Sequence, residues 1–143
     1  MLKSNTKWSF SLVPNSKIIL LAHGSRDPRW RMPFEVLIAN LKEELGQEKV
    51  DLAYMEFCSP SIEDVVFQSY KDGYFELNFL PLFMAGGAHL RKDVPNIFDK
   101  LKTGKPELSL NLLDPIGEHV LITNAILGIV KENLSQVHLD SIS

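Results

Sequence analysis

Three of the four histidines in this chain directly follow segments that are expected to form strands. His23 lies within Leu21–Arg26, His89 follows Gly86–Gly87, and His119 follows the fourth expected strand. Because the carboxyl ends of parallel strands meet at one edge of a sheet, we expect the three imidazoles to reach the same edge. A neutral imidazole binds borderline transition metals and moves protons near neutral pH. The pattern therefore predicts a metal-handling or acid–base site.

Glu56, at the end of the second expected strand, is predicted to join the histidines at this edge. Two imidazoles and a carboxylate suit divalent Fe, Co, Ni or Zn, with positions left open for exchange. Structural alternatives remain: His23 can hydrogen-bond its own loop, Glu56 can accept from the amides that open the next helix, and His119 can lie in a first helical turn. His89 is the stronger candidate, because Gly86–Gly87 allow a positive φ or close approach of the backbone to a ligand.

Basic residues are concentrated beside two of the histidines, although the formal net charge of the chain is -3. They are Arg26, Arg29 and Arg31 after His23, and Arg91 and Lys92 after His89. An acidic chain without a basic stripe is not expected to bind nucleic acid. The local charges are either solvated loop charges or a site for an anionic ligand.

Length and composition predict one domain, since 143 residues that are 45% hydrophobic can bury a core without cross-links. Cys58 is the lone cysteine, which excludes an internal disulfide and favours a reducing, cytoplasmic location. No apolar run reaches the ~18 residues of a membrane span, so no membrane association is expected. We expect an extension over residues 1–16, a domain over 17–134, and a frayed tail over 135–143.

Apolar runs predict strands at 18–22, 50–57, 74–83 and 108–113. Helical spacing predicts helices that begin at Pro33, at Ile62, at Asp93 as N-cap, and near Ile122. Strands that alternate with helices imply right-handed crossovers. The expected fold is therefore α/β, a three-layer sandwich with a four-stranded, mainly parallel sheet.

Four short segments, one after each expected strand, carry a resemblance to a known family. They are Leu21–Asp27; Ala53–Glu56 with Ser59–Ser61; Pro81–Phe83 with Gly87, His89 and Asp93–Pro95; and Gly117–His119. With these segments the chain resembles the short, single-domain sirohydrochlorin chelatases of the CbiX type, in the class II chelatase superfamily. The third segment is the most specific, because its proline-to-histidine and histidine-to-aspartate spacings both match the family pattern.

The resemblance implies a chelatase-like half domain that inserts a divalent metal, Co²⁺, Fe²⁺ or Ni²⁺, into sirohydrochlorin or a related tetrapyrrole. Such a reaction serves cobalamin- or sirohaem-type cofactor biosynthesis, with the metal as substrate and no organic cofactor. By position, His23 and His89 correspond to the family's metal-binding and catalytic histidines. Glu56 is a candidate for assisting proton removal or steering the metal, and His119 becomes a loop position or one that lies behind the metal-contacting residues. Asp93 either orients His89 or caps its helix.

Sirohydrochlorin bears many carboxylates, so its recognition should use charge-assisted hydrogen bonds. The candidate substrate-binding residues are Arg26, Arg29, Arg91, Lys92, Gly86 and Gly87. Phe83, Met84 and Trp30 are candidates for an apolar wall against the macrocycle. Because short members resemble half of the two-domain chelatases, a homodimer is the expected working unit.

Two other functions compete with metal insertion. A non-catalytic carrier of metal or tetrapyrrole would use the same residues without turnover. A phosphohydrolase would use His23 beside Arg26, but Ala22 stands where the histidine phosphatases have an arginine.

Overall fold

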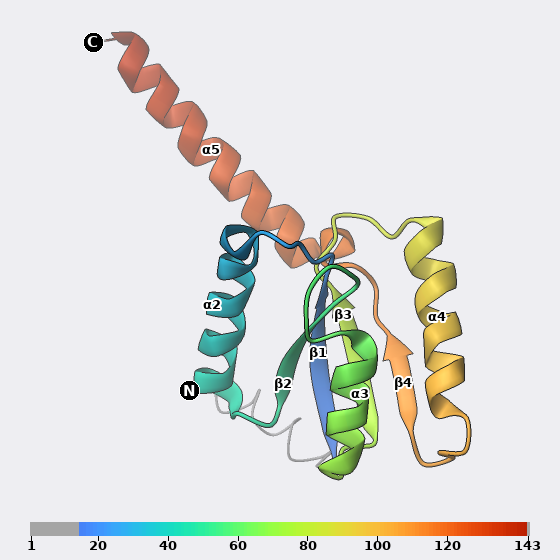
Figure 1. Cartoon of the computed structure of the whole chain (residues 1–143). Coiled ribbons are helices and arrows are strands. Elements are labelled where there is room, and N and C mark those ends of the chain that lie inside the picture. Colours follow the sequence, from blue (N-terminus) through green and yellow to red (C-terminus); the bar gives the residue numbers. More distant parts are fainter. Residues whose placement is uncertain (1–14, 143) are drawn as a thin grey trace.

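The computed structural model describes residues 15–142, and residues 1–14 of the expected extension lie outside this range. An entirely parallel, four-stranded sheet has helices on both faces, as expected for a three-layer sandwich (Figure 1). The elements in chain order are β1 (Ser16–Ala22), α2 (Pro28–Leu45), β2 (Val50–Tyr54), α3 (Ile62–Lys71), β3 (Glu76–Pro81), α4 (Ala88–Lys102), β4 (Ser109–Leu112), the 3₁₀ turn η1 (Ile116–Glu118) and α5 (Val120–Ile142).

The strand order is β2-β1-β3-β4, so β1 and β3 are neighbours although β2 separates them in the chain. Leu20 of β1 lies opposite Leu52 of β2 on one side and Leu80 of β3 on the other. The second strand is shorter than expected and ends at Tyr54. Phe57 has a φ of 71°, which is incompatible with strand geometry.

Alternate residues of each strand face two different helical layers. Ile19 and Leu21 of β1 point toward α3 and α4 and belong to the larger apolar cluster. Leu20 and Ala22 point the other way, into a smaller cluster that α2 covers. Both faces of the central strand are therefore buried, which explains its continuous apolar sequence.

Helix α2 begins at Pro28, five residues before the expected start at Pro33, which lies inside the helix. Asp27 is the N-cap, and its carboxylate accepts from the backbone N–H of Arg29 at 2.9 Å. Hydrogen bonds from Arg29 lower the pKa of Asp27. The bond from the Arg29 side chain has the larger effect and the bond from its backbone N–H the smaller. Pro28 and Pro33 are each compatible with the first turn of a helix, so the N-cap residue Asp27 determines where α2 begins.

Helix α5 runs away from the sheet (Figure 1) and continues to Ile142, so the expectation of a frayed tail after Ser135 is wrong. Asn78 of β3 and Asn111 of β4 are neighbours in the sheet, and the side-chain amide of Asn111 donates to Oδ1 of Asn78 at 3.0 Å. Within residues 15–142, no helix is both long enough and apolar enough to cross a membrane.

Candidate functional site

Between β1 and β3 the connecting helices switch from one face of the sheet to the other. The chain leaves β1 toward α2 on one face and leaves β3 toward α4 on the other (Figure 1). In open α/β sheets, ligands bind outside the carboxyl ends of the strands at such a point. The segments after β1 and β3 are therefore the ones best placed to form a site.

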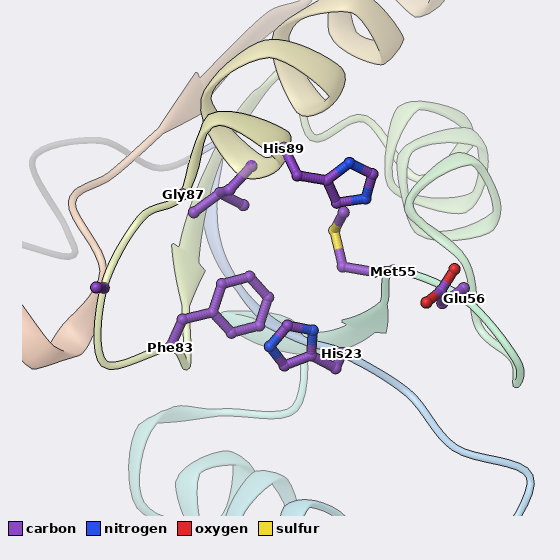
Figure 2. Close-up of a pocket in the computed structure, with 8 residues that line it drawn as sticks. His23, Met55, Glu56, Phe83, Gly87 and His89 are labelled. Atoms are coloured by element: carbon purple, nitrogen blue, oxygen red, sulfur yellow. The ribbon is translucent and has the colours of Figure 1, made fainter.

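A pocket of about 180 Å³ lies at this point. Its lining residues are His23, Met55, Glu56, Phe83, Ala85, Gly87, His89 and Leu90 (Figure 2). They come from the segments after β1, β2 and β3. The structure thus places His23, Glu56 and His89 around one cavity.

The His23 ring is held by stacking on Phe83. The two ring centroids are 4.0 Å apart and the planes are inclined by 21°. Phe83 is buried, with 8% of its surface exposed, so it is a fixed support for the imidazole. Of the three expected wall residues, only Phe83 lines the pocket. Trp30 belongs to α2 and packs against the smaller apolar cluster, and Met84 is 61% exposed.

The loop that carries His23 is joined to the segment after β2. The backbone N–H of Met55 donates to the carbonyl of Ala22 at 2.9 Å, and that of Glu56 donates to the carbonyl of His23 at 3.1 Å. Gly24 has a φ of +100°, and a Cβ at this position would lie 1.8 Å from the Glu56 carbonyl oxygen. Only glycine fits such an approach, so Gly24 sets the spacing between His23 and Glu56.

His89 belongs to the first turn of α4, because that helix begins at Ala88 with Gly87 as N-cap. The expectation that Asp93 is the N-cap is therefore wrong. Asp93 lies one turn further along α4, and its carboxylate contacts Nδ1 of His89. Gly87 has a φ of -82°, and Gly86 is not among the described glycines with positive φ. Neither glycine therefore has a positive φ, and of the two expected roles for this pair, close approach of the backbone to a ligand remains.

Glu56 is exposed and has no part in opening α3. That helix is capped by Ser61, whose hydroxyl accepts from the Asp64 N–H at 3.1 Å while Asp64 accepts from the Ser61 N–H at 3.0 Å. The helix-capping alternative for Glu56 is therefore excluded. Its side chain is left on the pocket wall, as Figure 2 shows.

His119 does not line the pocket. It follows η1, whose Gly117 N–H donates to the Phe83 carbonyl at 3.0 Å, so the chain after β4 returns to the segment after β3. Its backbone N–H donates to the Ile116 carbonyl at 3.0 Å, and its own carbonyl accepts from Ile122 and Thr123. Of the three candidate histidines, His23 and His89 line the pocket and His119 does not.

The basic candidates surround the site without lining the pocket. The Arg26 guanidinium lies 5.0 Å from the centroid of the Phe57 ring. Arg29 pairs with Asp27 at 3.3 Å, and Arg91 pairs with Glu118 at 3.6 Å. Lys92 is exposed on α4. Of the six candidate substrate-binding residues, only Gly87 is in the pocket lining.

Met55 and Leu90 are lining residues that sequence reasoning did not assign. Each lies beside a residue that was assigned, Glu56 and His89 respectively. The Met55 thioether points between His89 and His23 (Figure 2). Its exposure on the pocket side depends on how the segment after β2 turns, which no local pattern reveals.

The donors at this pocket are two imidazoles, one carboxylate and a thioether. Within residues 15–142, no group of three or more His, Cys, Asp or Glu side chains is placed to hold a metal ion. His23, His89 and Glu56 thus share a pocket without forming a ready three-ligand set. Two imidazoles, His23 after β1 and His89 in α4, therefore face one cavity.

Comparison with known proteins agrees with this fold. The CbiX family model matches residues 17–133. A crystal structure of a cobalamin (vitamin B12) biosynthesis CbiX protein from Marinobacter aquaeolei VT8 superposes with a TM-score of 0.75 at 39% identity, covering 85% of this chain and 98% of that one.

Two curated relatives carry names that specify an activity. The sirohydrochlorin cobaltochelatase of Methanopyrus kandleri is 35% identical over 81 residues, 56% of each protein. The chloroplastic sirohydrochlorin ferrochelatase of Arabidopsis thaliana is 27% identical over 124 residues, 87% of this chain and 55% of that protein. The matched segment thus spans little more than half the length of these relatives. With the family match over residues 17–133, the chain belongs to the CbiX family.

Proposed function

We propose that this protein inserts a divalent metal ion into sirohydrochlorin or a closely related tetrapyrrole. The observation that carries the proposal is the pair of imidazoles, His23 and His89, that face one cavity at the switch point of the sheet. The names of the two curated relatives, a cobaltochelatase and a ferrochelatase of sirohydrochlorin, support the substrate class. We further propose that Co²⁺, Fe²⁺ or Ni²⁺ is the metal substrate.

Metal insertion requires two pyrrole N–H protons to leave while the metal exchanges its ligands. In the proposed mechanism, His23 and His89 contact the incoming metal and accept protons through their neutral rings. Glu56, across the pocket, assists proton removal or attracts the cation. Phe83 and Met55 supply the apolar surface next to which the flat macrocycle lies.

The basic residues around the pocket are proposed to bind the carboxylates of the tetrapyrrole. Arg26 follows β1 and Lys92 belongs to α4, whereas Arg29 and Arg91 already have acidic partners. Arg91 would exchange Glu118 for a substrate carboxylate in this proposal. Their exposed positions suit a substrate whose charged groups lie at the rim of the macrocycle.

Turnover distinguishes a chelatase from a carrier. We expect anaerobic mixtures of sirohydrochlorin with Co²⁺, Fe²⁺ or Ni²⁺ to show catalysed change of the macrocycle's absorption spectrum, through many equivalents of substrate per protein. The uncatalysed rate with each metal is the control. Conversion that stops at one equivalent would support the carrier and contradict the enzyme.

We also propose that the working unit is a homodimer in which α5 meets a second copy. Ile122 is half-buried, and every other described side chain of α5 is exposed. The exposed large apolar residues of this helix are Val120, Leu121, Ile126, Leu127, Ile129, Val130, Leu134, Val137 and Ile142. A helix with so many apolar side chains normally buries them against another protein surface. Leu127, Val130, Leu134 and Val137 recur at the spacing of a two-helix seam.

The dimer predicts a specific effect of charge on α5. We expect Leu134→Glu to convert a dimer into a monomer, because it buries a carboxylate in the seam. Analytical ultracentrifugation measures the mass directly. Ser135→Glu, which adds the same side chain away from the seam, is expected to remain dimeric. A dimer that persists in Leu134→Glu would show that α5 is not the interface.

A further inference from the structure

The carboxylate of Asp93 is the side-chain partner of His89. The two residues are one helical turn apart on α4, and Oδ2 of Asp93 contacts Nδ1 of His89. An ionised carboxylate can only accept a hydrogen bond, so this contact favours the proton on Nδ1. The second ring nitrogen, Nε2, is then left with a free electron pair in the neutral ring.

Little else restrains the His89 ring. Its side chain is 78% exposed, and it lies in the first turn of a helix whose N-cap, Gly87, has no side chain. The partner histidine differs, because His23 is stacked on the buried Phe83 ring at 4.0 Å. Thus the two imidazoles of the pocket have different contacts: a carboxylate contacts that of His89, and an aromatic ring stacks on that of His23.

We propose that Asp93 is the positioning residue of His89, holding the Nδ1–H tautomer so that Nε2 is the atom presented to the pocket. Asp93 does not line the pocket and acts only through His89. The effect on tautomer requires no substrate, whereas the effect on rate rests on the proposed metal insertion. An imidazole with the wrong nitrogen protonated would offer the pocket an N–H in place of an electron pair.

The test compares three variants of the full chain at a pH where imidazole is neutral. Asp93→Leu removes the acceptor at similar size, and Asp93→Asn keeps an amide oxygen that can accept from Nδ1–H. Asp99→Leu is the matched control on the same helix, where Asp99 is 76% exposed. Nitrogen NMR of protein with labelled histidine reports which ring nitrogen is protonated, and a His89→Gln spectrum assigns the His89 signals.

We expect Nδ1 to be protonated in the wild type and in Asp93→Asn, and Nε2 to be protonated in most molecules of Asp93→Leu. The kcat for metal insertion should fall about 10- to 100-fold in Asp93→Leu, as for other residues that orient a metal-contacting histidine. KM for the tetrapyrrole should be unchanged. Asp93→Asn should recover most of the rate, and Asp99→Leu should behave as wild type.

Two results would overturn the assignment of Asp93. One is a wild-type His89 ring protonated on Nε2, and the other is an Asp93→Leu protein with unaltered tautomer or unaltered kcat. Absence of metal insertion in the wild type would instead reject the proposed function. The tautomer measurements on the substrate-free protein would still decide the role of Asp93 toward His89.

Discussion

His89→Ala is expected to lower the kcat of metal insertion by about 10²- to 10⁴-fold, the usual contribution of a positioned proton-transfer group. Stability should hardly change, because the side chain is 78% exposed and fills no part of the core. We expect the free energy of unfolding to stay within about 0.5 kcal/mol of the wild type. Absorption assays of the tetrapyrrole and urea denaturation measure the two quantities.

The matched control for this variant is His119→Ala. His119 also follows a strand, but it lies outside the pocket beyond η1. It is expected to keep wild-type kcat. Retained turnover in His89→Ala, together with a normal circular dichroism spectrum, would show that His89 has been given the wrong role.

Gly24→Ala is expected to lower the free energy of unfolding by about 2–4 kcal/mol. The backbone there has a φ of +100°, and a Cβ would lie 1.8 Å from the carbonyl oxygen of Glu56. The added methyl group must therefore push the His23 loop away from the segment after β2. A displacement of about 1 Å at a reacting group costs on the order of 10²-fold in rate. Denaturant titration and the insertion assay measure both losses.

The matched control for Gly24→Ala is Gly73→Ala, which introduces the backbone strain of a positive φ without a steric clash of the added Cβ. Gly73 has a φ of +88°, but a Cβ there meets nothing within 4 Å. It should cost only about 1–2 kcal/mol, the strain of a left-handed alanine, and leave the kcat unchanged. Equal destabilisation by the two variants would mean that the loop at Gly24 moves aside without penalty, against our expectation.

The elements of this protein were largely predictable because their signals are local. A continuous apolar run, such as the one that includes Leu20 and Leu21, is typical of a strand covered on both faces, and β1 is such a strand. Boundaries were less predictable. Asp93 has the side chain of an N-cap, yet α4 begins earlier, at Ala88, and its N-cap residue Gly87 supplies no side-chain cap. Where two starts are compatible with the local sequence, packing chooses between them.

The candidate site was predictable to a similar extent. His23, His89 and Glu56 were expected at one edge of the sheet, and all three line the pocket. The basic residues were expected to bind the carboxylates of an anionic ligand, but Arg29 and Arg91 have acidic partners in the structure. Arg29 pairs with Asp27, two residues before it, whereas the partner of Arg91, Glu118, is distant in sequence. Only the second pairing lay beyond the local pattern.

The sequence by itself determined which residues stand at the carboxyl ends of the strands, because apolar periodicity and turn residues act over a few neighbouring positions. Only the tertiary structure decided which of these ends are adjacent. The order β2-β1-β3-β4 puts the segments after β1 and β3 side by side, so that His23 stacks on Phe83, whereas His119 does not line the pocket that they form. Strand order results from pairing between distant segments and from burial on both faces of β1. Those interactions exist only once the chain has folded, and they select His23 and His89 from the three candidate histidines.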